Sequence, residues 1–123
     1  MNILVTGCNG QLGNEFQKIS NFNIDHSWTF TDINELNICD EHSVNTFFLN
    51  NNIDVCINCA AYTAVDNAEN EEEKAREINA TAALNLAKAC KSSNTLLIHI
   101  STDYVFDGTS ERPYLEDDIV SPN

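Results

Sequence analysis

The sequence has few basic residues, no long hydrophobic run and no basic leader. Its 123 residues include 6 Lys and Arg against 19 Asp and Glu, which gives a formal net charge of −13. Because no basic cluster is present, neither nucleic acid nor an anionic membrane surface is an expected partner. No apolar run approaches the ~20 residues that a membrane-spanning helix needs. Residues 1–5 form a hydrophobic strand directly, so we expect a cytoplasmic protein.

The sequence has one pair of closely spaced cysteines, Cys56 and Cys59, and lacks the second pair that a zinc site would need. The chain has 5 cysteines, and without a signal peptide we expect reduced thiols, mostly buried as small apolar side chains. Cys56 and Cys59 have the spacing of a redox or zinc pair, but they lie in an apolar run that predicts a strand. Residues three apart on a strand point to opposite faces. No metal site is therefore predicted.

Apolar runs alternate with amphipathic ones, which is the pattern of a parallel sheet with crossover helices. Strands are predicted over 3–5, 28–31, 55–57 and 96–100, and helices over 11–20, from the N-cap Asp40 to residue 50, and over roughly 68–91. Polar groups inside this pattern need partners. We expect His99 to be a core histidine, and Asn79 to lie on the packed face of the long helix, bonded to a neighbouring strand.

This order of elements predicts the α/β class. The expected fold is a Rossmann-like doubly wound parallel sheet with helices on both faces. Four strands followed by a long polar loop are typical of the first part of such a domain. We therefore expect residues 1–123 to be an incomplete NAD(P)-binding Rossmann domain, truncated after about four strands.

The strongest chemical signal is the sequence TGCNGQLG over residues 6–13, between the first strand and the first helix. Gly7 can make the tight turn, Gly10 lets the backbone approach a pyrophosphate, and Gly13 lets helix and strand pack closely. The free N–H groups at the start of the helix would face the phosphates. The segment predicts a dinucleotide-binding turn.

Asp32 supports this interpretation because it ends the second strand about 20 residues past the turn, the usual place for an acidic residue that bonds the adenosine ribose. Its carboxylate would repel a 2′-phosphate, and the next residue is Ile33, not an arginine. The sequence thus favours NAD(H) over NADP(H).

The glycine spacing GxxGxxG resembles that of the extended short-chain dehydrogenase/reductase superfamily. Two further segments, NCAAYTAVDNAE over 58–69 and STDYVFDG over 101–108, are similar to the dTDP-4-dehydrorhamnose reductase family. The resemblance runs from Asn2 to Asn123. It implies reduction, with NADH or NADPH, of the 4-keto group of dTDP-4-dehydro-L-rhamnose to dTDP-L-rhamnose. A dTDP-sugar is then the implied partner, and a homodimer of the intact protein stays open.

The resemblance also implies roles for single residues. Thr102 matches the catalytic Ser/Thr and would contact the sugar together with Asp103. Asn37 stands where the family commonly has an aspartate. The residues implied at the cofactor lie in the glycine turn, after the second and third strands, and at the end of the fourth: Gly7, Gly10, Gln11, Leu12, Gly13, Asp32, Asn37, Ile38, Ala61, Tyr62, Thr63 and Ile100.

The family's catalytic Tyr-x-x-x-Lys pattern does not occur in these 123 residues. None of Tyr62, Tyr104 and Tyr114 has a lysine four residues on. We expect this helix and the substrate domain beyond Asn123. Two alternatives stay open: a non-catalytic nucleotide-binding regulatory subunit of the same superfamily, and a nucleotide-sugar epimerase or dehydratase, which the STDYVFDG segment disfavours.

Overall fold

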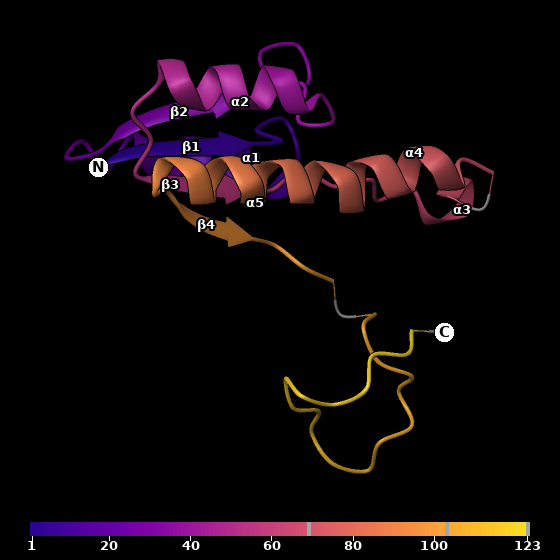
Figure 1. Ribbon diagram of the computed structural model, residues 1–123. Helices are drawn as coiled ribbons and strands as arrows, with labels where there is room; N and C mark the ends of the chain where they lie inside the picture. The colour runs from indigo at the N-terminus through magenta and orange to yellow at the C-terminus, as the bar shows by residue number, and fades with distance from the viewer. Residues whose placement is uncertain (69, 103, 123) are drawn as a thin grey trace.

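The computed structural model describes residues 1–68, 70–102 and 104–122. Its centre is a four-stranded parallel sheet in the order β2-β1-β3-β4 (Figure 1). The strands are β1 (Asn2–Thr6), β2 (Ser27–Thr31), β3 (Val55–Asn58) and β4 (Leu96–His99). The predicted Rossmann-like fold class is confirmed, and each predicted strand is present with ends shifted by one residue at most.

The larger half of the core lies between the sheet and two helices, α2 (Glu41–Asn50) and α5 (Ala82–Ser93). Leu4 and Cys56 point to this face from the central strands. The predicted N-cap of α2 is confirmed, because the Asp40 carboxylate accepts a hydrogen bond from His42 N at 3.0 Å. The other buried apolar residues of this half come from the two helices and the loops beside them: Leu36, Ile38, Val44, Phe48, Ile53, Ala82, Leu86, Ala89 and Cys90.

The other face of the sheet carries α1 (Gln11–Ser20), which has the predicted bounds. Phe16 packs with Trp28, their ring centroids 6.3 Å apart. The apolar side chains of α1 are only partly buried, since Leu12 and Ile19 are 41% and 46% exposed. Helix α1 packs against β1 near the β2 side of the sheet and leaves the apolar side chains of β4 on this face exposed.

The predicted long helix over roughly 68–91 is present, but it begins four residues later. It runs without interruption through α4 (Glu72–Arg76), a π-helical turn η1 (Glu77–Thr81) and α5, and a short α3 (Val65–Ala68) precedes it. Glu71 adopts a non-helical backbone conformation before α4. Alanine spacing alone could not reveal the π-helical turn, because the residues on both sides of it keep a helical pattern. Asn94 ends α5 in the left-handed conformation, which asparagine tolerates.

The expected core position of His99 is also wrong. His99 is exposed on the edge strand β4, where its Nδ1 lies 3.0 Å from Nδ2 of the buried Asn58. Beyond β4, the described residues of the C-terminal segment form neither helix nor strand, and this segment extends away from the sheet (Figure 1). Among the described residues, none of the helices is both long and apolar enough to cross a membrane.

Candidate functional site

A cavity of about 280 Å³ opens at the carboxyl ends of β1, β2 and β3. In doubly wound folds this edge of the sheet is where ligands bind. Six of the predicted cofactor residues line it, from the glycine turn and from the loops after β2 and β3: Gly7, Gly10, Asp32, Asn37, Ile38 and Ala61. The remaining wall is mostly apolar and includes Leu36, Ala60 and Ile78.

The glycine turn requires its glycines for steric reasons. Gly7 has φ +66°, and a Cβ there would lie 2.6 Å from the backbone N and Cα of Ala60. A Cβ on Gly13 would lie 2.6 Å from Cys8 Cα and closer still to the Gly7 carbonyl oxygen. Gly10 is less crowded, with Gly7 O at 3.3 Å from its added Cβ. The glycines therefore allow the turn to pass directly beneath the loop after β3.

The start of α1 faces this turn. Its N-cap is Gly10, which has no side chain to bond the first N–H groups of the helix. Such a helix start attracts anions through its N–H groups and its dipole. The turn can thus hold a phosphate group with backbone atoms alone.

Asp32 lies at the β2 side of the cavity, and its carboxylate is fixed by backbone groups. Its Oδ2 accepts from Asn9 N at 3.1 Å, and its Oδ1 accepts from Ile33 N at 2.8 Å. Glu35 adds a second carboxylate, which accepts from Asp32 N at 2.9 Å. The pKa of the nearby Cys8 thiol is raised, first by burial and then by the charges of Asp32 and Glu35. This side of the cavity is therefore negative and suited to hydroxyl groups.

Asn58 ends β3 and organises the backbone beneath the cavity. Its Oδ1 accepts from Thr6 Oγ1 at 2.6 Å and from Ala60 N at 3.1 Å. Because Asn58 is buried, these bonds join the ends of β1 and β3 rigidly. The sequence placed Asn58 in a family-like segment without giving it a role.

Asn85 is a second residue that the sequence reasoning missed. It is buried on α5, and its Nδ2 donates to the carbonyl oxygens of Ile38 and Cys39, both at 3.1 Å. These carbonyls belong to the loop after β2 that lines the cavity. An asparagine on an otherwise apolar helix face was the available signal, since a buried amide needs partners.

Two thiols also line the cavity, Cys39 and Cys59. Burial raises the pKa of both thiols, and the charge of Glu77 raises that of Cys39 further. Raised pKa values keep these thiols protonated and poorly nucleophilic. Across residues 1–68, 70–102 and 104–122, no group of three or more His, Cys, Asp or Glu side chains could hold a metal ion.

Several predicted residues do not line the cavity. Gln11, Leu12 and Gly13 begin α1, and Tyr62 and Thr63 follow the lining residues in the loop after β3. Ile100 is 44% exposed just beyond β4. Thr102 follows it, with Oγ1 accepting from Tyr104 N at 3.2 Å. Asp103 lies outside the described residues. The structure thus collects in one cavity six of the residues implied at the cofactor, from the glycine turn and the loops after β2 and β3, and does not collect those implied for the sugar.

Asn79 lies elsewhere than predicted. It is exposed, and its amide bonds the backbone of Tyr62 in the loop after β3, not a strand.

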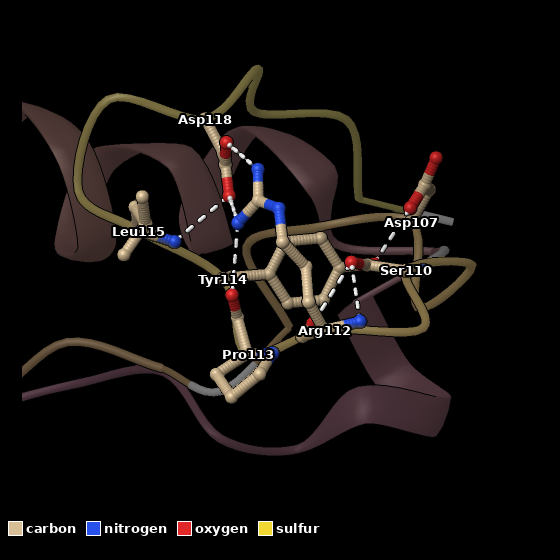
Figure 2. Close-up of polar contacts among 7 residues, drawn as sticks. All are labelled: Asp107, Ser110, Arg112, Pro113, Tyr114, Leu115 and Asp118. Carbon is tan, nitrogen blue, oxygen red and sulfur yellow. Dashed lines mark hydrogen bonds and ion pairs between the residues drawn. The ribbon is translucent and has the colours of Figure 1, made fainter.

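The segment after Thr102 is braced by its own side chains (Figure 2). Arg112 pairs with both carboxylate oxygens of Asp118, at 2.8 and 2.6 Å. The Tyr114 hydroxyl donates to Asp107 at 2.8 Å and accepts from Ser110 N at 3.1 Å. The Arg112 guanidinium holds the pKa of Asp118 below its usual range, since it bonds the charged form. The loop therefore has a defined shape without regular secondary structure.

Comparison with known proteins identifies close similarity along the whole chain. The family model described as RmlD substrate binding domain matches residues 1–123. A dTDP-4-dehydrorhamnose reductase of Mycolicibacterium smegmatis is 42% identical over 121 residues, which cover 98% of this chain and 36% of that protein.

Two solved structures agree. A dTDP-4-dehydrorhamnose reductase of Clostridium acetobutylicum has 45% sequence identity and a TM-score of 0.92, covering 99% of this chain and 43% of its own. The corresponding reductase of Bacillus anthracis, solved in complex with NADP, has 36% identity and a TM-score of 0.91, covering 98% of this chain and 43% of its own. The chain thus spans less than half the length of these three proteins.

Proposed function

The chain belongs to the RmlD substrate binding domain family, and from this we propose that it is the cofactor-binding part of a dTDP-4-dehydrorhamnose reductase. The proposed reaction is the reduction, with a nicotinamide dinucleotide, of the 4-keto group of dTDP-4-dehydro-L-rhamnose to dTDP-L-rhamnose. The supporting observation is the cavity that joins the glycine turn to Asp32, together with the names of relatives that match the whole chain.

The residues present fit a dinucleotide. Gly7, Gly10 and the start of α1 would hold the pyrophosphate, because the N–H groups at the helix start have no side-chain cap and Gly10 lets a phosphate approach the backbone. Asp32 would bond the adenosine ribose, and Asn37 and Ile38 would lie by the adenine. Ala61 would continue the wall towards the nicotinamide, with Tyr62, Thr63 and Ile100 further along the same edge.

When bound, the reduced nicotinamide supplies the hydride. In our proposal Thr102 binds and orients the substrate carbonyl through its hydroxyl, and Asp103 contacts the sugar. A proton must also reach the carbonyl oxygen. The tyrosine of a Tyr-x-x-x-Lys helix outside residues 1–123 is the proposed donor, which makes residues 1–123 an incomplete catalytic unit.

The assay that tests this function follows NADH oxidation by the full-length protein with dTDP-4-dehydro-L-rhamnose. We expect turnover to dTDP-L-rhamnose. The 123-residue chain alone should be slower by at least ~10²–10⁴-fold, the usual contribution of a general acid. A full-length protein that binds NADH and never consumes it would instead support the non-catalytic regulatory subunit.

We expect Asp32→Ala to weaken the binding of NADH more than that of NADPH. Loss of the ribose hydrogen bonds should cost ~1.5–3 kcal/mol, since the acceptor is charged. Loss of the negative charge removes repulsion of the 2′-phosphate, which offsets part of that cost for NADPH alone. Titration of both cofactors against both full-length proteins measures the difference.

The matched control is Asp25→Ala, an exposed carboxylate in the turn before β2. It should leave both affinities unchanged. An equal loss for the two cofactors in Asp32→Ala would contradict the ribose assignment. The relative solved with NADP makes this comparison informative.

A further inference from the structure

Asn79 binds the backbone of Tyr62 at two points. Its Oδ1 accepts from Tyr62 N at 2.8 Å, and its Nδ2 donates to Tyr62 O at 3.1 Å. One side-chain amide therefore satisfies both backbone groups of a residue that belongs to no helix or strand. Because two hydrogen bonds join the same two residues, they fix both the distance and the orientation of the Tyr62 backbone relative to the helix.

The helix around Asn79 has an unusual geometry. Asn79 is the middle residue of the π-helical turn η1 (Glu77–Thr81), and its neighbour Ile78 lines the cavity. π-helical turns are rare in proteins, and many of those that occur are at functional sites. Two successive residues of this turn thus contact the cavity and the loop that bounds it.

The loop after β3 is held at two points. Asn58 Oδ1 accepts from Ala60 N near its start, and Asn79 holds Tyr62 two residues further on. Ala60 and the intervening Ala61 both line the cavity. Their side chains are single methyl groups, so little side-chain bulk enters the cavity from this part of the loop.

The side chain of Tyr62 is held as well. Its hydroxyl donates to Glu71 Oε2 at 2.5 Å, and Lys74 lies 3.3 Å from the same oxygen and 5.5 Å from the centre of the Tyr62 ring. These groups are largely exposed, so their ion pair adds little by itself. The amide of Asn79 bonds the backbone of Tyr62 directly, whereas Glu71 and Lys74 contact only its side chain.

The order of the strands places this loop opposite Asp32. Asp32 follows β2, the glycine turn follows β1, and Ala60–Tyr62 follow β3, so the three lie in sequence along one edge of the sheet. A dinucleotide with its adenosine at Asp32 and its pyrophosphate at the turn extends its nicotinamide half over β3. Ala60 and Ala61 share the cavity with Asp32, whereas Tyr62, the residue that Asn79 holds, lies beyond them and would border the nicotinamide half.

We propose that Asn79 is a positioning residue for the nicotinamide half of the cofactor, acting through the Tyr62 backbone. The inference rests on the proposed function, because it requires a nicotinamide dinucleotide in this cavity. Asn85 holds the wall at the adenine side, and Asn79 holds the wall at the nicotinamide side.

The test measures the dissociation constants of NADH and of ADP, which lacks the nicotinamide half, by titration of the full-length protein. We expect Asn79→Ala to weaken NADH about five- to twentyfold, the loss of one or two net hydrogen bonds, and to change ADP less than about twofold. Asn79→Asp keeps the acceptor for Tyr62 N but places an oxygen against Tyr62 O. It should weaken NADH in the same selective way.

Asn21→Ala is the matched control. Asn21 is also exposed and also donates its amide to a backbone carbonyl, Gln17 O at 3.2 Å, but at the far end of α1. It should leave NADH and ADP unchanged. Thermal unfolding of each variant checks that the fold is intact.

The outcomes are distinct. Equal weakening of NADH and ADP in Asn79→Ala, or no weakening of either, overturns the positioning role, and so does wild-type NADH binding by Asn79→Asp. If the unmodified full-length protein binds ADP and not NADH, the proposed function fails first. Selective loss of NADH in both Asn79 variants supports the inference.

Discussion

Gly13→Ala should unfold the protein at much lower denaturant concentration and abolish dinucleotide binding. The added methyl group would overlap the Gly7 carbonyl oxygen and lie 2.6 Å from Cys8 Cα. These are backbone atoms, and Cys8 N is bonded to Thr31 O at 3.1 Å, so the turn cannot move aside without breaking a contact with β2. We expect a loss of about 3 kcal/mol or more, the upper range for overpacking.

Gly10→Ala separates stability from binding. Its methyl group would meet only Gly7 O, at 3.3 Å, so the free energy of unfolding should change by less than about 1 kcal/mol. Because Gly10 lines the cavity, NADH binding should still be lost. Urea unfolding and NADH titration of both variants measure the two effects. A Gly13→Ala protein with wild-type stability would contradict the packing described for the turn.

Thr102→Val should lower kcat for the 4-keto sugar by about 10²–10³-fold, the typical effect of removing one donor to a developing oxyanion. Valine keeps the shape of threonine and removes the hydroxyl that would bond the carbonyl oxygen. The dissociation constant of NADH should stay unchanged, since Thr102 does not line the cavity. Steady-state kinetics of the full-length protein check the rate.

Thr102→Ser is the matched variant, because it retains the hydroxyl and its bond from Tyr104 N. It should keep most of the activity. If the Val and Ser variants lose activity equally, the hydroxyl alone is not sufficient, because the serine variant retains it. Full activity in Thr102→Val would show that another group orients the substrate.

The glycine turn, α1 and Asp32 could be predicted because each has a signal within a short segment of sequence. Gly13 is required by its close neighbour Cys8, although the contact that excludes a side chain at Gly7 is with the distant Ala60. Asp32 ends a strand that its own sequence defines. The parallel pairing of the four strands followed from their alternation with helices, since parallel strands need crossover connections. Local signals were therefore enough for the fold and for six of the residues that line the cavity.

Asn79, Asn85 and His99 could not be placed from the sequence. Asn79 bonds a residue 17 positions away, and Asn85 bonds residues 47 and 46 positions away, across loops whose course no local pattern records. His99 was misplaced because an apolar strand predicts burial without telling a central strand from an edge. The π-helical turn was missed because one residue of changed helical phase leaves the apolar spacing almost intact.

The central position of β1 also has a consequence for synthesis on the ribosome. β1 is made first, yet it pairs with β2 on one side and with β3, Val55–Asn58, on the other. At ~5–20 residues per second, its second neighbour emerges several seconds after it. During that time Ile3, Leu4 and Val5 are exposed in the nascent chain. We expect these residues to be a contact site for ribosome-associated chaperones. This expectation follows from the order of the strands in the sheet and not from the composition of the chain.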